Sequence, residues 1–449
     1  MTNSPSHVSS TPTFPPELGR RYPVVVRGEG VWLKDSAGNR YLDAMSGGSM
    51  AATLGHGRRD IIAAARRQAD RVTYVHNERL TNPAQESLAT ELIGVAPPGF
   101  TRAKFVTGGS EANETAIRLA RAYHVERGES QRWQIVSPAQ AYHGPTFETL
   151  ALTGRPGLQD PLGPYLTNHL HIPPSTWRFD PSGEAALEAL DGALAEAGPE
   201  NVAAFFCEPI SAAALPAYTP PERFWRGLAE RREQHGFLIC FDEVVTGMGR
   251  TGTWFAYQQL PIQPDIVTAG KGLGAGYAPL AAVLCGEHVY EAIAAGSRSF
   301  EHGHTWDDAP LPCAVGLAVM DVLIERGLIE RVHTRGPSLR DELEAALADL
   351  KIVREVRGRG FLLGVEFVDP RDGASILPDE LHLDELIDDI AFEHGLLVTS
   401  THPNRDGYAS DQTLLAPAFV SSDGELAAMI ERLARTLAVV EQRVTEALS

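Results

Sequence analysis

Lysine is scarce in this chain. Of the 39 lysine and arginine residues, only Lys34, Lys104, Lys271 and Lys351 are lysines. Arginine stays protonated in proteins, whereas a desolvated lysine can become a neutral nucleophile. Lys271 lies between Gly270 and Gly272 in an otherwise apolar stretch. A lysine kept in this setting, in a chain that otherwise uses arginine, points to chemistry that arginine cannot perform.

Cysteine and long apolar runs are also scarce. The four cysteines are scattered, and no pair has the spacing of a metal site, so we expect reduced, buried thiols and a cytoplasmic location. No apolar run approaches 18 residues, and the N-terminus has no apolar signal segment, so we expect no membrane span. Residues 1–20 begin with a Ser-, Thr- and Pro-rich tract and are expected to form a flexible arm.

Basic residues are fewer than acidic residues in this chain. The formal net charge of −19 argues against nucleic acid or an anionic membrane as the main partner, although a local pocket can still bind an anion. A length of 449 residues and a hydrophobic fraction of 43% suffice for a full core and for two domains.

The stretch from Phe241 to Gly274 carries the strongest chemical signal. One apolar strand, residues 237–241, ends at Asp242, and a second, residues 265–268, ends shortly before Lys271. Two parallel strands that end side by side can bring this acid and this amine into one pocket at the carboxyl edge of a sheet. Pyridoxal phosphate needs both groups, an amine for a Schiff base and a carboxylate for the pyridinium nitrogen.

Upstream residues fit an anion site and an α/β core. Residues 104–107 read as a strand, 108–110 as a glycine turn and 111–126 as a helix, an order that favours a phosphate at the helix N-terminus. Tyr142 is a candidate for stacking on a ring. Strands and helices alternate from residue 104 to 283, which predicts a largely parallel sheet.

The last third changes character. We expect a helical region over residues 311–350 with a break near Gly336-Pro337, then short strands and a closing helix over residues 422–448. These elements predict a separate α+β domain. The boundaries expected are 1–20 for the arm, 21–75 for the N-terminal part of the small domain, 76–320 for the large domain, and 321–449 for the C-terminal part. The glycines at 358, 360 and 364 miss the dinucleotide-binding spacing.

With these motifs in hand, the chain resembles the class III aminotransferases, the pyridoxal-phosphate enzymes that include the ω-amino acid and amine transaminases. The resemblance covers about residues 28–448. The motifs that carry it stand in family order: Gly38-Asn39-Arg40-Tyr41-Leu42-Asp43, Gly109-Ser110-Glu111-Ala112-Asn113-Glu114, Tyr142-His143-Gly144, Cys207-Glu208-Pro209, Phe241-Asp242-Glu243-Val244 and Ala269-Gly270-Lys271-Gly272. It implies fold type I, with a mainly parallel seven-stranded sheet and a smaller α+β domain. It also implies a homodimer or a dimer of dimers with shared active sites.

The resemblance also implies residue roles. Lys271 would be the Schiff-base lysine and proton shuttle, and Asp242 would pair with the pyridine N–H. The other cofactor contacts would come from Gly109 and Ser110 at the phosphate, Tyr142 and Val244 on the two ring faces, Tyr142's neighbour His143, Glu208 near Asp242, and Thr305 reaching the phosphate of the partner subunit. No metal is implied.

The chain departs from the ornithine-type members in its substrate pocket. Pro145 stands where they carry an arginine, and Ala213 where they carry a glutamate. Asp307 and Asp308 replace a small, glycine-containing stretch after Thr305. A carboxylate in the pocket still needs a cation. Arg405, in the loop that precedes the strand 413–415, is the candidate because similar amine transaminases place a mobile arginine there.

The predicted function is therefore transfer of an amino group from an amine or ω-amino acid to a short 2-oxo acid such as pyruvate, by a ping-pong mechanism. Two alternatives stay open on the same cofactor, an aminomutase and a decarboxylating transaminase. A third, from a different class, is a non-catalytic protein with this fold.

Overall fold

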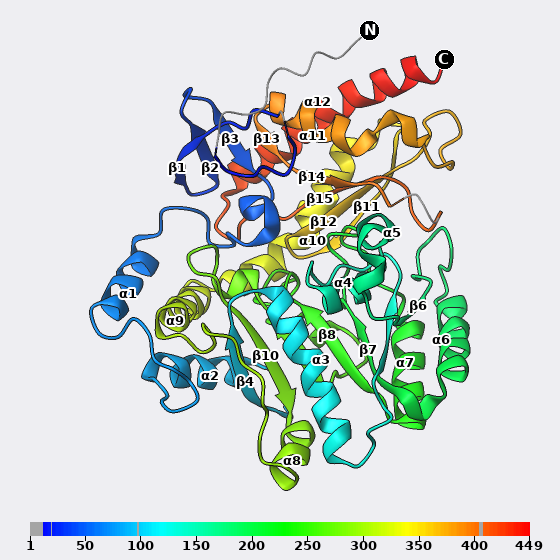
Figure 1. The fold of residues 1–449 in the computed structure, drawn as a ribbon. Helices are drawn as coiled ribbons and strands as arrows, with labels where there is room; N and C mark the ends of the chain where they lie inside the picture. Colours follow the sequence, from blue (N-terminus) through cyan, green and yellow to red (C-terminus); the bar gives the residue numbers. More distant parts are fainter. Residues whose placement is uncertain (1–11, 19, 97, 404–406) are drawn as a thin grey trace.

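The computed structural model describes residues 12–18, 20–96, 98–403 and 407–449. A seven-stranded sheet forms its centre (Figure 1). Its strands from β9 to β6 run parallel, whereas β10 is antiparallel to both β4 and β9. The mainly parallel seven-stranded sheet predicted from the sequence is confirmed. The strands follow in the order β4 (Phe100–Val106), β10 (Ala281–Gly286), β9 (Ile266–Ala269), β8 (Leu238–Glu243), β7 (Val202–Cys207), β5 (Gln134–Pro138) and β6 (Leu170–Ile172).

Helices cover both faces of this sheet, so its central strands are buried throughout. Alternate residues of β7 point to opposite faces: Phe205 joins the core that includes α6 (Glu184–Ala197) and α7 (Glu222–His235). Phe206 joins the core beneath α3 (Gly109–Glu126) and α8 (Glu287–Ala295). This double coverage explains why β7 is a continuous apolar run and why β8 is apolar as far as Phe241.

Two four-stranded sheets lie beyond the large one, in the upper part of Figure 1. The first joins the two ends of the chain, because β3 (Arg40–Asp43) pairs in parallel with β13 (Leu396–Leu397). It also contains β1 (Val25–Glu29) and β2 (Trp32–Asp35). The second contains β11 (Val353–Arg359), β12 (Leu362–Phe367), β15 (Gln412–Leu415) and β14 (Thr399–Thr401).

The break expected within the long helical region lies elsewhere. Helix α9 (Pro310–Glu325) ends near Gly327, which has a left-handed φ of 57°, and α10 (Leu328–Leu347) then runs on with Pro337 inside it. The expected break near Gly336-Pro337 is therefore wrong. Gly336 serves a close approach instead, since a Cβ there would lie 2.5 Å from the Cα of Gly360. The domain division at residues 75 and 320 stays a proposal, and α9 crosses the second position.

The carboxyl edge of the large sheet meets the two smaller sheets through a buried arginine. The guanidinium of Arg250, eight residues after Asp242, donates hydrogen bonds to the carbonyl oxygens of Phe361 at 3.0 Å and Pro417 at 2.6 Å. It also donates to the hydroxyl of Ser46 at 3.0 Å. Segments from the two ends of the chain thus close over the edge where β8 and β9 end.

Within the described residues, no helix is both long and apolar enough to span a bilayer.

Candidate active site

Asp242 and Lys271 leave neighbouring parallel strands at the same edge. In the register of β8 and β9, Asp242 stands opposite Thr268, and Lys271 follows Thr268 by three residues. Lys271 has a positive φ of 40°, which a non-glycine residue adopts only at a cost. The parallel strand ends therefore place the acid and the amine predicted from the sequence in one region, with backbone strain at the lysine.

The lysine lies in a desolvated setting among charges. Burial lowers the pKa of Lys271, while the nearby charges of Asp242 and Glu208 raise it. The positive charge of Arg250 lowers it further. The lowered pKa of Lys271 makes the neutral amine easier to form at neutral pH. The neutral amine is the form that can attack a carbonyl and accept a proton.

The carboxylate of Asp242 is held by three close donors. Its Oδ2 accepts from Nδ1 of His143 at 2.8 Å and from the side-chain amide of Asn113 at 2.7 Å. Its Oδ1 accepts from the backbone N–H of Val244 at 3.0 Å. Hydrogen bonds of this kind fix the orientation of the carboxylate. His143 thus acts on Asp242, and its Nε2 is buried without a hydrogen-bond partner among the described residues.

Asn113 and Thr268 belong to this network, although the sequence did not single them out. Asn113 lies one turn into α3, and its amide also donates to the carbonyl oxygen of His143 at 2.7 Å. The hydroxyl of Thr268 donates to Asn113 Oδ1 at 2.8 Å. The signal for Asn113 was its place inside the quoted motif after the glycine turn. Thr268 had none, because its partners become neighbours only in the folded chain.

The glycine turn before α3 forms a tight cradle. A Cβ on Gly109 would lie 2.8 Å from Cγ1 of Val244, and a Cβ on Gly270 would lie 3.1 Å from the same atom. Gly144, with a φ of 133°, likewise leaves no room for a Cβ beside the Ser110 hydroxyl. Val244 therefore packs between two glycine turns, and the Tyr142–Gly144 loop packs against Ser110. Both contacts lie at the N-terminus of α3, where backbone N–H groups are free for an anion.

Glu208 positions the segment of Tyr142. Its carboxylate accepts from the backbone N–H groups of Tyr142 at 3.3 Å and Ala212 at 3.1 Å, and from the Ser211 hydroxyl at 3.3 Å. Burial raises the pKa of Glu208 to about 7, with the charge of His143 lowering it and that of Asp242 raising it. Glu208 therefore acts on the loop of Tyr142, and it reaches Asp242 only through its charge.

Asp307 and Asp308 anchor the segment that carries Thr305. The Lys104 ammonium lies 2.9 Å from Asp307 Oδ2 and 3.5 Å from Asp308 Oδ2. Asp308 Oδ1 also accepts from the backbone N–H of Phe105 at 2.9 Å. Thr305 and Trp306 remain exposed, and Trp306 packs edge-on against Tyr74, with ring centroids 5.5 Å apart. The two acids that depart from the family pattern thus tie this segment to β4.

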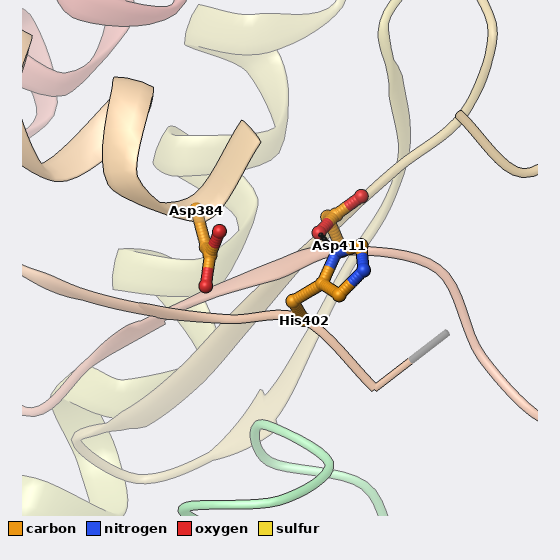
Figure 2. A group of neighbouring side chains, drawn as sticks. All are labelled: Asp384, His402 and Asp411. Carbon is orange, nitrogen blue, oxygen red and sulfur yellow. Dashed lines mark hydrogen bonds and ion pairs between the residues drawn. The ribbon is translucent and has the colours of Figure 1, made fainter. Parts of the chain in front are cut away.

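Arg405 lies outside the described residues, but the flanks of its loop are described. Figure 2 shows His402 beside Asp411, with Asp384 close by on α11 (Leu383–Glu393). Their ligand atoms lie within 4.8 Å of one another. His402 Nδ1 is 2.5 Å from Asp411, and its Nε2 is 3.2 Å from Asp379.

The same cluster behaves as an ion-pair network. Burial alone would lower the pKa of His402, but the hydrogen bond to Asp411 and the charges of Asp411 and Asp379 raise it above its usual value. Carboxylate oxygens of Asp411 and Asp379 already contact the two ring nitrogens of His402. The cluster therefore pairs charges at the base of the loop.

Comparison with known proteins identifies the family. The family described as Aminotransferase class-III matches residues 16–437. An uncharacterized aminotransferase, YodT, from Bacillus subtilis (strain 168) is 34% identical over 435 residues, covering 96% of this chain and 98% of the relative. Hypotaurine/taurine–pyruvate aminotransferase from Paracoccus denitrificans (strain Pd 1222) is 31% identical over 409 residues, covering 89% and 88%.

A solved structure agrees. The ω-transaminase from Pseudomonas jessenii in complex with PMP superposes with a TM-score of 0.86 at 30% sequence identity, covering 94% of each chain. The chain belongs to the class III aminotransferases, which use pyridoxal phosphate. The resemblance read from the sequence is confirmed.

The groups brought together fit this cofactor. The turn before α3 leaves backbone N–H groups free for a phosphate dianion. The close approaches of Gly109 to Val244 and of Gly144 to Ser110 show that this turn packs tightly against its neighbours. Lys271 supplies a desolvated amine, and Asp242 supplies a carboxylate oriented by three donors. Amine, carboxylate and anion cradle are the three groups that the cofactor requires.

Proposed function

We propose that this class III aminotransferase takes an amino group from an amine or an ω-amino acid and delivers it to a short 2-oxo acid such as pyruvate, in two half-reactions. The observation that carries this proposal is the residue type at two positions, one three residues after Tyr142 and one five residues after Glu208. Pro145 is exposed and uncharged where the ornithine type has an arginine, and Ala213 stands in the apolar run 212–215. The fixed clamp for an α-carboxylate is therefore missing.

The relatives support this choice of substrates. The Paracoccus denitrificans relative is named for hypotaurine, taurine and pyruvate, and the Pseudomonas jessenii structure is an ω-transaminase. In hypotaurine and taurine the amine lies at the far end of a short chain from the acid group. Donors of that shape, and simple amines, are the class that we assign to this chain.

Each residue of the site has a proposed task. Bound pyridoxal phosphate supplies an electron sink for the substrate carbon that loses its proton. The Lys271 amine holds the cofactor between turnovers and moves the proton during them. Asp242, held by Asn113, His143 and the Val244 N–H, would accept a hydrogen bond from the ring nitrogen and keep it protonated. Gly109 and Ser110 would bind the phosphate, and Tyr142 and Val244 would cover the two ring faces.

Two copies of the chain would complete the site. Thr305 is exposed beside the Tyr74–Trp306 pair, whose indole is 56% exposed, and exposed aromatic pairs are frequent at interfaces. A groove of about 1040 Å³ between α3 and residues 299–304 includes His304, the neighbour of Thr305, in its lining. We assign this surface to the interface of a homodimer or of a dimer of dimers, with Thr305 reaching the phosphate of the partner subunit.

The cysteines support a reducing compartment. Cys207, Cys240, Cys285 and Cys313 are all buried and unpaired, which suits an enzyme of the cytoplasm.

A panel of donors tests the proposal. The purified enzyme with pyruvate or 2-oxoglutarate should convert amines and ω-amino acids, and pyruvate should be the better acceptor. Product analysis separates the alternatives, because an aminomutase would return an isomer of the donor and a decarboxylating transaminase would release carbon dioxide. Absence of any amino transfer, with the cofactor bound, would favour the non-catalytic reading.

A further inference from the structure

Arg155 has few hydrogen-bond acceptors among the described residues. Its guanidinium is half-buried, and its one hydrogen bond in the described part of the chain goes to the Thr401 hydroxyl at 3.3 Å. No described carboxylate lies within 4.0 Å of it, the limit for an ion pair. Arg250 and Arg357, which are also shielded from solvent, each donate to at least three acceptors. Five N–H donors with one weak acceptor leave a partly buried cation under-compensated.

The backbone ties Arg155 to the segment that presents Tyr142. Gly154 has a left-handed φ of 61°, and a Cβ there would lie 2.9 Å from the Cα of Ala139. The carbonyl oxygen of Gly154 accepts from the backbone N–H of Gln140 at 2.9 Å. Arg155 is therefore held at a fixed offset from residues 139–142, which lead from β5 to Tyr142.

The guanidinium faces a cavity between this segment and the C-terminal part of the chain. The cavity has a volume of about 210 Å³, and its lining includes Gln140, Arg155, Leu158, Asp379 and His402. Across it, Asp379 is engaged by the His402 ring at 3.2 Å. Burial lowers the pKa of Arg155, whereas the charges of Tyr142, Glu208 and Asp384 raise it. Arg155 thus lies within electrostatic range of both Tyr142 and Glu208, on the side of the site that faces Thr401.

We propose that Arg155 binds the distal acid group of an ω-amino acid donor and so determines that such donors are preferred over plain amines. The inference rests on the proposed function. It is separate from the role of Arg405, which concerns the oxo acid. A carboxylate, sulfinate or sulfonate at the far end of the donor would supply the acceptors that the guanidinium lacks, in a charge-assisted and often bidentate contact.

The test compares two donors that differ in one charged group. In single-turnover reactions of the cofactor-loaded enzyme, 4-aminobutanoate and butylamine are followed by cofactor absorbance, so that no oxo acid takes part. Arg155→Gln should lower the ratio of the rate constant for 4-aminobutanoate to that for butylamine by about tenfold or more, since a tenfold change is about 1.4 kcal/mol. Arg155→Lys should restore part of the ratio. Arg59→Gln, at an exposed arginine on α1 (Arg59–Ala69), should leave the ratio within about twofold.

A binding measurement separates recognition from folding. Calorimetry with butanoate, which carries the acid group but no amine, should show about tenfold weaker binding to Arg155→Gln than to the wild type. An unchanged ratio with unchanged butanoate binding would overturn the inference, as would an equal loss for both donors. If the wild type used neither donor, the proposed function would fail, whereas loss of butanoate binding in Arg155→Gln would still place an anion at Arg155.

Discussion

Lys104 pairs with Asp307, with 2.9 Å between Nζ and Oδ2, and so binds β4 to the segment that carries Thr305. The Asp307 side chain is fully buried, and the same carboxylate accepts from the backbone N–H of His304 at 2.9 Å. Asp308 adds a second carboxylate to Lys104 and accepts from Phe105 N. Two acids that look foreign to the family pattern are therefore the anchors of the proposed dimer contact.

Asp307→Asn should loosen this anchor. Lys104 would lose its closest partner. Because Lys104 keeps some contact with water, we expect a loss of about 3 kcal/mol in the free energy of unfolding, the low end for a broken buried pair. Chemical denaturation measures that loss. Sedimentation and cofactor titration should show weaker dimers and weaker cofactor binding. Asp341→Asn, which breaks an exposed pair with Arg340, is the control and should change neither. Unaltered assembly and cofactor affinity in Asp307→Asn would disconnect this anchor from the dimer.

Lys271 should carry the cofactor. Treatment of the yellow holoenzyme with borohydride followed by peptide mapping should find the cofactor mass on the peptide that contains Lys271. Lys271→Ala should lower the rate of amino transfer by about 10²–10⁴-fold or more, because one group performs both attachment and proton transfer. Lys351→Ala, at an exposed lysine, should keep the rate. A cofactor adduct on another lysine would remove Lys271 from this role.

Glu208 should make the cofactor-free protein less stable as pH rises. Burial raises the pKa of Glu208 from 4.5 to about 7. Between pH 4.5 and 7 the folded state therefore holds a proton that the unfolded chain has lost, so stability falls with rising pH and levels off above about pH 7. Glu208→Gln should flatten this dependence by roughly 1–3 kcal/mol across the window.

Denaturation of the cofactor-free protein at several pH values measures the effect. The large negative net charge also lowers stability as pH rises, so the informative quantity is the difference in slope between variants. Glu188→Gln, at an exposed position of α6, should keep the wild-type slope. Parallel curves for Glu208→Gln and the wild type would show that Glu208 does not titrate in this range.

Arg405 should matter for the oxo acid. Arg405→Ala should raise the Michaelis constant for pyruvate by about tenfold or more, since one charge-assisted contact contributes roughly 1.5–3 kcal/mol. The half-reaction with an uncharged amine should keep most of its rate. Steady-state kinetics with varied pyruvate and single-turnover kinetics with butylamine provide the two measurements. Equal losses in both, or a loss in neither, would exclude Arg405 from the substrate site.

The sequence by itself determined that Asp242 and Lys271 would lie at the same edge of the large sheet. Asp242 and Lys271 each follow an apolar strand, and β8 and β9 pair in parallel, so the two residues must emerge at one edge. The glycine turn before α3 was also predictable, because a strand, a glycine turn and a helix each leave a local pattern in the sequence. The long helices were found as well, but the break was placed at Gly336-Pro337, where glycine in fact serves contact with Gly360.

Only the tertiary structure decided which residues hold the side chains of the site in place. Asn113 bonds to Asp242 across 129 residues of sequence, and Phe105 N–H donates to Asp308 across 203. Arg155 meets Thr401 across 246 residues, and local sequence shows only a loop arginine after a glycine. Strand and helix patterns report short-range geometry, whereas hydrogen-bond partners and electrostatic neighbours follow from how distant segments pack. For that reason the aminotransferase class was predictable from the sequence, whereas the residues that position Asp242 and the segment of Thr305 were not.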